Sequence, residues 1–324
     1  MPLSAPRVRT SRREPRSLHR GTFAAICAVV LAASVAYANS DVATVSLASA
    51  NAKGGRLAPA VPPSTERHLL VGAKAGDTTF SNMDAVIGQV KVTRTFYPGA
   101  LPATFSARDI TPGVKIIVSY KHPSANTALY VKSIPRGVNV EMVFHHEAEG
   151  PHDYPGDPSV AGPAFVKAFD AEAAVIHRAN PKMRVAFVGG GYQYKGAPGG
   201  TRGLGGYFIP NGADDFYLDS YQRTTMVPAQ QDPSLQNYIK ELAKKGHQFN
   251  GYTEYGRGVI APGTTSSPAV AAARANVIKV DAAYLKSLPN VDVWAYWFTT
   301  DLVNGDQWRF TDAASISAWK TAAS

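Results

Sequence analysis

The feature that most constrains the fold is an alternation between short apolar runs and longer segments of helical or loop-like composition. Runs of about six to ten residues that are rich in β-branched and aromatic side chains are typical of strands. The runs occupy residues 68–73, 90–97, 114–121, 138–147, 183–190, 214–221, 249–256 and 291–298.

Helical patterns separate several of these runs. They are clearest in residues 164–179, 234–246 and 267–289, and the last two end as helices commonly do, at Gly246 after two lysines and at Pro289. Eight strands alternating with helices over about 255 residues predict a single (β/α)8 TIM barrel. The second and third connections are weak as helices, so a doubly wound open sheet is the alternative.

The segment before the first run is predicted to lie outside the barrel. Residues 1–38 combine six arginines with an uncharged apolar run that ends in Ala36-Tyr37-Ala38, an order typical of a secretory signal peptide. General or twin-arginine export fits, and an uncleaved N-terminal membrane anchor stays open. Residues 39–66 are rich in Pro, Ala and Ser and predict a disordered linker. The barrel domain is expected over residues 67–324, in a secreted protein.

Charge and cysteine content narrow the possible functions. Cleavage after residue 38 lowers the formal net charge from +9 to +4, because six arginines and one glutamate leave with the signal. No basic stripe with interleaved aromatic residues remains, so nucleic acid is not an expected partner. The one cysteine, Cys27, lies in the signal, which excludes disulfides and thiolate chemistry from the mature protein.

Polar residues end several of the runs. In a TIM barrel the C-terminal ends of the strands open onto the face that carries the active site. The fourth run ends at His145-His146-Glu147 and the seventh at Glu254-Tyr255-Gly256. Glu147 and Glu254 are therefore expected to face each other across the mouth, as the two carboxyl groups that glycosidic cleavage requires.

The histidines raise two further points. Adjacent strand residues point to opposite faces, so His146 and Glu147 share the mouth only if the chain leaves strand geometry there, as we expect. A metal site made by His145 and His146 with His152 and Asp153 is the alternative reading. The sequence lacks the H-E-x-x-H pattern, and we predict neither a metal nor another cofactor.

The paired glutamates resemble those of clan A glycoside hydrolases, and within that clan the mannanase-type barrels of family 26. In the clan the acid/base glutamate ends strand four and the nucleophile ends strand seven, and in family 26 a histidine precedes the first. His146-Glu147 is similar to that pair, and the sequence YTEYG around Glu254 is similar to the nucleophile motif. The resemblance implies a retaining mechanism with Glu147 as general acid/base and Glu254 as nucleophile.

The resemblance extends to two more strands. Residues 214–221 are similar to the strand-six segment that contributes an aspartate and a tyrosine, which here are Asp219 and Tyr221. Trp297 stands where the clan places a tryptophan that stacks on sugar, although aromatic residues also fill barrel cores, and Trp294 is expected to be core. Together with His146, these residues are the predicted supports of the reaction.

Other strand ends supply further candidates. Arg94 and Lys121 end the second and third runs and are candidates to contact the nucleophile or sugar hydroxyls, with surface salt bridging as the alternative. Tyr192 is a candidate sugar contact or a core residue. The glycine-rich residues 189–208 contain no nucleotide-binding pattern and are interpreted as a mobile flap.

Two hypotheses follow. The first is a secreted retaining glycoside hydrolase that cleaves a β-linked polysaccharide, β-mannan or a related β-glycan, in an endo-acting manner. The second is a secreted barrel that binds carbohydrate or cell wall without cleaving it. In both, the expected partner is a polysaccharide or oligosaccharide, with no membrane contact after signal cleavage, and the expected state is a monomer.

Overall fold

The structure is a computed structural model that describes residues 69–75, 86–88, 90–106, 112–196, 200–258, 265–298, 308–309 and 311–324. The predicted signal peptide, residues 1–38, and the predicted linker, residues 39–66, lie outside the described residues. Among those that are described, no helix is both long enough and apolar enough to cross a bilayer.

All eight predicted strands form, and every recorded pairing between them is parallel. The pairing order is β1-β8-β7-β6-β5-β4-β3-β2, with no reversal of the kind that defines a doubly wound sheet. The strands are β1 (Leu70–Ala75), β2 (Val92–Ala100), β3 (Lys115–His122), β4 (Val140–Phe144), β5 (Arg184–Gly190), β6 (Asp215–Gln222), β7 (Gly251–Arg257) and β8 (Val293–Phe298).

The two ends of this series also meet, which closes the barrel. β1 lies against β2 as well as β8. Gly72 makes the approach possible, because a Cβ atom built on it would lie 1.9 Å from the carbonyl oxygen of Val92. The prediction of a (β/α)8 barrel is confirmed.

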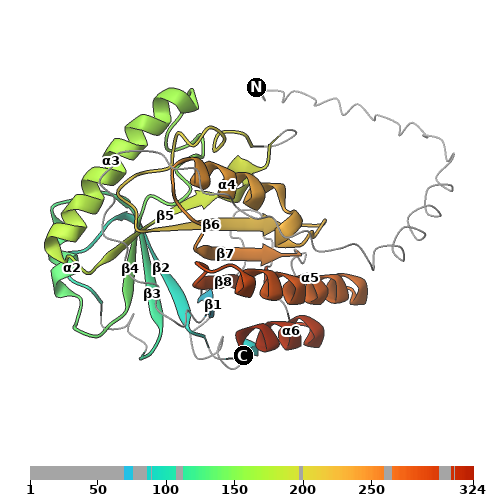
Figure 1. Cartoon of the computed structure of the whole chain (residues 1–324). Coiled ribbons are helices and arrows are strands. Elements are labelled where there is room, and N and C mark those ends of the chain that lie inside the picture. The colour runs from blue at the N-terminus through green and yellow to red at the C-terminus, as the bar shows by residue number, and fades with distance from the viewer. Residues whose placement is uncertain are drawn as a thin grey trace, which may run out of the picture. The chain divides into compact units, whose positions relative to one another are not determined.

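Helices follow five of the strands in the described part of the chain and lie around them (Figure 1). Four helices are capped by a side chain that accepts a hydrogen bond from a backbone N–H of the first turn, which satisfies a donor that the helix leaves open. Three of the four begin with proline, as at Pro158. The helices are α2 (Asn126–Ser133), α3 (Pro158–Ala179), α4 (Pro233–Lys244), α5 (Pro268–Ser287) and α6 (Ala313–Ala323), with short 3-10 helices η2 (Gly191–Tyr194) and η3 (Ala229–Gln231).

The barrel interior is apolar in its middle and polar at both ends. The middle is a buried cluster of mostly β-branched and small residues: Val92, Ile117, Val143, Ala186, Val188, Tyr217, Val293 and Ala295. Because strand residues alternate between faces, residues two positions further along each strand also point inward. The polar groups at the C-terminal ends of the strands therefore lie directly above this apolar layer.

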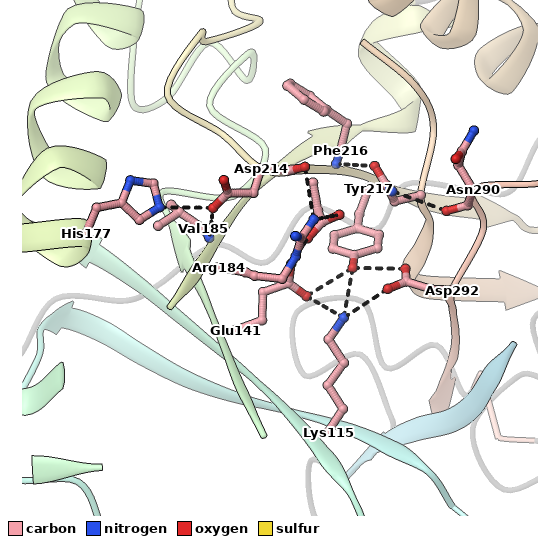
Figure 2. Close-up of polar contacts among 12 residues, drawn as sticks. Lys115, Glu141, His177, Arg184, Val185, Asp214, Phe216, Tyr217, Asn290 and Asp292 are labelled. Carbon is pink, nitrogen blue, oxygen red and sulfur yellow. Dashed lines mark hydrogen bonds and ion pairs between the residues drawn. The ribbon is translucent and has the colours of Figure 1, made fainter. Parts of the chain in front are cut away.

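A buried ionic cluster closes the N-terminal end of the barrel (Figure 2). Lys115 Nζ lies 2.8 Å from Glu141 Oε2 and 3.3 Å from Asp292 Oδ2, and it donates a hydrogen bond of 3.0 Å to the Tyr217 hydroxyl. Arg184 pairs with Asp215 beside it. We assign this layer to stability, because the bottom face of such barrels is structural and the open top carries the site.

Candidate active site

The centre of the site is Arg94 on β2, whose guanidinium group is fully buried. Its Nη1 donates to both oxygens of Asp219, at 3.1 and 2.9 Å, and to Glu254 Oε1 at 2.9 Å, while Nε donates to Ser119 Oγ at 2.8 Å. Burial raises the pKa of Asp219, against the opposing effect of Arg94. The same buried cation lies 2.9 Å from Glu254 and stabilises the charged form of that carboxyl group as well.

Glu254 does not end β7, as the sequence suggested, but lies in its middle. The pairing with β6 shifts register between Leu218↔Tyr252 and Asp219↔Glu254, so β7 carries one extra residue there. A bulge of this kind re-aims side chains. It turns both Thr253 and Glu254 toward the interior, where the Thr253 hydroxyl donates to Asp219 Oδ1 at 2.6 Å.

An aromatic wall surrounds the nucleophile candidate. The Tyr221 hydroxyl donates a short hydrogen bond to Glu254 Oε2, and burial together with the negative Glu254 raises the pKa of that hydroxyl. Trp297 packs edge-on against Tyr221, with ring centroids 6.2 Å apart, and against Phe96 at 6.0 Å. Phe96 also contacts the ring of His146 at 5.4 Å. Trp297 and His146 therefore belong to the same mouth, whereas Trp294 is fully buried core, as predicted.

Glu147 reaches the mouth because the chain leaves strand geometry after β4. The strand ends at Phe144, three residues earlier than the sequence suggested, and His145 and Glu147 have φ values of 51° and 55°. The expected departure from strand geometry is confirmed. The left-handed conformation costs a residue with a side chain about 1–2 kcal/mol, so surrounding contacts must hold this turn. One of them is the Glu147 N–H, which donates to the Val188 carbonyl at 2.8 Å.

The environment of Glu147 opposes ionisation. Withdrawal from water raises its pKa well above the usual glutamate value, and the negative charges of Asp219 and Glu254 raise it further. Its side chain lies over Gly190 of β5, where an added Cβ atom would be 3.4 Å from the Glu147 carboxylate. One glutamate at the mouth is thus paired with a cation, and the other favours its protonated form. This asymmetry is what a nucleophile and a general acid require.

The remaining predicted residues are placed less centrally. Lys121 forms an ion pair of 2.8 Å with Asp153, which also lies 3.2 Å from His145, so its recorded partner is the loop after β4 and not the carboxylate pair. Tyr192, in η2, is 66% exposed and lines a groove beside Tyr221. No group of three or more His, Cys, Asp or Glu residues in the described part of the chain is arranged to hold a metal ion.

The site also contains residues that were not predicted from the sequence. Phe96 stands two positions after Arg94 and so faces the same way, a signal that the strand period carries. Thr253 could not have been found, because the bulge that turns it inward is not visible in the sequence. In the glycine-rich residues 189–208, Tyr194 and Phe208 are fully buried whereas Tyr192 and Tyr207 are exposed, so the segment is anchored at two points and the mobile flap stays a prediction.

No protein-family model matches the sequence, and no curated protein matches it significantly. Solved structures do. A β-glucuronidase from Bacteroides uniformis is matched with a TM-score of 0.50 at 10% identity, over 80% of this chain and 35% of that one. The FMN-binding β-glucuronidase from Facaelibacterium prausnitzii L2-6 is matched with a TM-score of 0.52 at 11% identity, over 80% and 44%.

A GH128 (subgroup I) endo-β-1,3-glucanase from Amycolatopsis mediterranei is matched at 15% identity and a TM-score of 0.49, over 78% of this chain and 99% of that one. The chain is thus similar in fold to the matched parts of the two β-glucuronidases. At these identities the likeness is one of fold alone, and this chain spans less than half of each of the two β-glucuronidases. The narrower resemblance to family 26 stays a prediction.

Proposed function

We propose that this protein is a secreted retaining glycoside hydrolase that cleaves a β-linked polysaccharide, β-mannan or a related β-glycan. Glu254 is the nucleophile and Glu147 is the general acid/base. One observation carries the proposal: two glutamates at the mouth of one barrel have opposite electrostatic environments. Arg94 lies 2.9 Å from Glu254, whereas burial and negative neighbours raise the pKa of Glu147.

The reaction then proceeds in two steps. In the first, a Glu254 oxygen attacks the anomeric carbon and the glycosidic C–O bond breaks, while Glu147 gives its proton to the leaving oxygen. In the second, Glu147 removes a proton from water, the water oxygen attacks the anomeric carbon, and Glu254 is released as a carboxylate. Loss of the neighbouring negative charge in the intermediate favours ionisation of Glu147, which fits its change from acid to base.

The side chains around the pair have supporting roles. Arg94 and Asp219 fix Glu254, because Arg94 binds both carboxylates at once. Tyr221 orients the other oxygen of Glu254. Trp297, held edge-on by its aromatic neighbours, offers a ring face on which an apolar sugar face can stack, and His146 lies on the same side of the mouth.

A groove beside the pair supports cleavage within a polysaccharide chain. It has a volume of about 520 Å³, inside the range of about 300–1,000 Å³ that is usual for ligand pockets. Tyr221 lines the groove and also donates a hydrogen bond to Glu254, so the groove lies next to the nucleophile. Tyr192 stands on its rim with most of its ring exposed. A substrate that fills the mouth and the groove extends beyond one sugar ring, as endo action requires.

The test is a panel of β-mannans, β-glucans and xylans with detection of new reducing ends. The wild type is expected to cleave one class, and Glu254→Ala to cleave none. Glu147→Ala is expected to lose the polysaccharide yet still release dinitrophenol from an aryl glycoside of the cleaved sugar, with azide restoring turnover as the glycosyl azide. A wild type that binds a polysaccharide of the panel without cleaving it would instead support the non-catalytic barrel.

The role of the groove is tested separately. Tyr192→Ala is expected to raise KM for oligosaccharides several-fold and leave kinetics on a short aryl glycoside unchanged, because only a long substrate reaches the groove. Tyr207→Ala is the matched control, since Tyr207 is also an exposed tyrosine (43%) but does not line the groove. Equal KM values for the wild type and Tyr192→Ala on every chain length would remove the groove from the substrate path.

A further inference from the structure

Glu149 is a buried carboxyl group that the proposed reaction does not use. The residue has no exposed surface, and its pKa is raised to about 7 by burial. Its Oε1 accepts a hydrogen bond of 2.7 Å from the Tyr194 hydroxyl, and its Oε2 accepts one of 3.3 Å from the Gly190 N–H. A carboxyl group is costly to bury, so its place two residues after Glu147 calls for an explanation.

Two glycines of β5 show where the two glutamates lie. Consecutive strand residues face opposite sides of the sheet. A Cβ atom on Gly190 would lie 3.4 Å from the Glu147 carboxylate, whereas one on Gly189 would lie 3.0 Å from Glu149 Oε1 and 3.1 Å from the Tyr194 ring. Glu147 is therefore inside the mouth and Glu149 is behind β5, between the sheet and its outer layer. From there Glu149 cannot contact a substrate in the mouth, so it can affect the reaction only through Glu147, either by holding the loop or by its charge.

Arg202 holds the same loop from its other side. It donates from Nε to the Glu149 carbonyl at 2.6 Å, from Nη2 to the Tyr154 carbonyl at 2.5 Å, and from Nη1 to the Gly156 carbonyl. Its guanidinium group lies 5.7 Å from the centre of the Phe208 ring, which is itself fully buried. One side chain of the glycine-rich segment thus binds the loop after β4 at three points.

We propose that Glu149 and Arg202 are positioning residues, which together hold the strained turn of Glu147 in the orientation that proton transfer requires. The catalytic part of this inference rests on the proposed function. Residues with φ near +50°, such as His145 and Glu147, persist only where their surroundings fix them. Glu149 restrains the turn through its hydrogen bonds from Gly190 of β5 and from Tyr194. Arg202, in the glycine-rich segment after β5, restrains it through hydrogen bonds to the loop carbonyls.

The arrangement also links Glu149 to the proton of Glu147. The charge of Glu149 raises the pKa of Glu147, although by less than burial, Asp219 or Glu254 does. Neutralising Glu149 removes that contribution. The basic limb of the activity profile, which follows loss of the proton from Glu147, then moves to lower pH. A residue with only a structural role would not move it.

Three variants test the inference with increasing severity. Tyr194→Phe removes only the hydroxyl that donates to Glu149, Glu149→Gln removes the charge and keeps the shape, and Arg202→Met removes the three backbone contacts. Arg136→Met is the matched control, because Arg136 is exposed on the loop before β4, outside the site. Hydrogen exchange of residues 145–156 is measured without substrate. The kinetic readout is kcat/KM for an oligosaccharide and for the dinitrophenyl glycoside of the same sugar.

We expect Arg202→Met to speed exchange in residues 145–156 at least about tenfold and the control to leave it unchanged. For all three variants kcat/KM for the oligosaccharide is expected to fall about tenfold or more, and for the dinitrophenyl glycoside about twofold or less, because only the first substrate needs the acid. Glu149→Gln is expected to move the basic limb of the pH profile to lower pH.

Two results would overturn the inference: unchanged exchange in the loop of Arg202→Met, or an equal fall in kcat/KM for both substrates with an unmoved pH limb. The exchange measurement needs no activity, so it stands even if the protein cleaves nothing. In that case the proposed function fails and the loop restraint is still decided. If Glu149→Gln does not fold, Tyr194→Phe gives the same leaving-group comparison with one hydroxyl removed.

Discussion

Replacing Arg94 by methionine should destabilise the fold and remove the activity together. The change removes the buried cation that both Asp219 and Glu254 share and puts an apolar chain of similar length in its place. The variant loses three hydrogen bonds from Arg94 to the two carboxylates and the hydrogen bond from Arg94 to Ser119. Neither carboxylate can turn to water, because Asp219 is fully buried and Glu254 nearly so.

The contacts set the size of the effect. At an effective dielectric constant near 20, one unit-charge pair at 2.9 Å gains about 6 kcal/mol, and much of that is offset by the desolvation of the guanidinium group. Breaking a buried pair by removing one partner typically costs about 3–5 kcal/mol. For a domain of this size that cost lowers the melting temperature by roughly 6–20 °C.

The sign of the pH dependence follows from linkage. Burial already raises the pKa of Asp219, and Arg94 opposes the rise. Without Arg94, the pKa of Asp219 in the folded variant lies above its pKa in the unfolded chain. Between these two pKa values the folded variant binds more protons than the unfolded chain, so its free energy of unfolding falls as pH rises. The deficit relative to the wild type should therefore be larger at pH 8 than at pH 5.

Urea denaturation at both pH values, followed by far-UV circular dichroism, measures the effect. Arg94→Lys is the companion variant, because it keeps the charge and loses the forked geometry, so it should recover part of the stability. A loss below about 1 kcal/mol in Arg94→Met, or an equal loss at pH 5 and pH 8, would contradict the reasoning that a shared buried cation holds the two carboxylates.

Three further predictions concern other parts of the chain. A crystal structure should place the carboxyl groups of Glu147 and Glu254 about 5–5.5 Å apart, the spacing of a retaining enzyme, and a separation beyond about 10 Å would end the pairing. Lys115→Met should lower the free energy of unfolding in urea by about 3–5 kcal/mol, because it breaks the ionic cluster at the barrel bottom, yet kcat of the folded fraction should stay that of the wild type. Exported protein should begin at or near Asn39 by N-terminal sequencing, and deletion of residues 39–65 should leave activity almost unchanged; a membrane-bound chain that begins at Met1 would show an anchor.

The order of the elements could be predicted from sequence because it depends on local pattern. Strand and helix periods differ, so eight runs could be located without knowing what they contact, and parallel strands in a barrel bring their C-terminal ends to one face. That alone placed Glu147 and Glu254 in one mouth. Dependence on local pattern also explains an error in the predicted boundaries. The strand predicted over residues 138–147 ends three residues earlier, at Phe144, because histidine and glutamate after an apolar run do not indicate a left-handed turn.

The sequence by itself determined the fold class, the strand order and the pair of carboxyl groups. Tertiary structure decided what each carboxyl group does. Arg94 and Asp219 are 125 positions apart, and no local pattern states that they meet. The bulge that turns Glu254 inward, the burial that raises the pKa of Glu147, and the face of β5 on which Glu149 lies all depend on long-range packing. Charge environments are set by every group within a few ångströms, and those groups come from strands that only the closed barrel brings together.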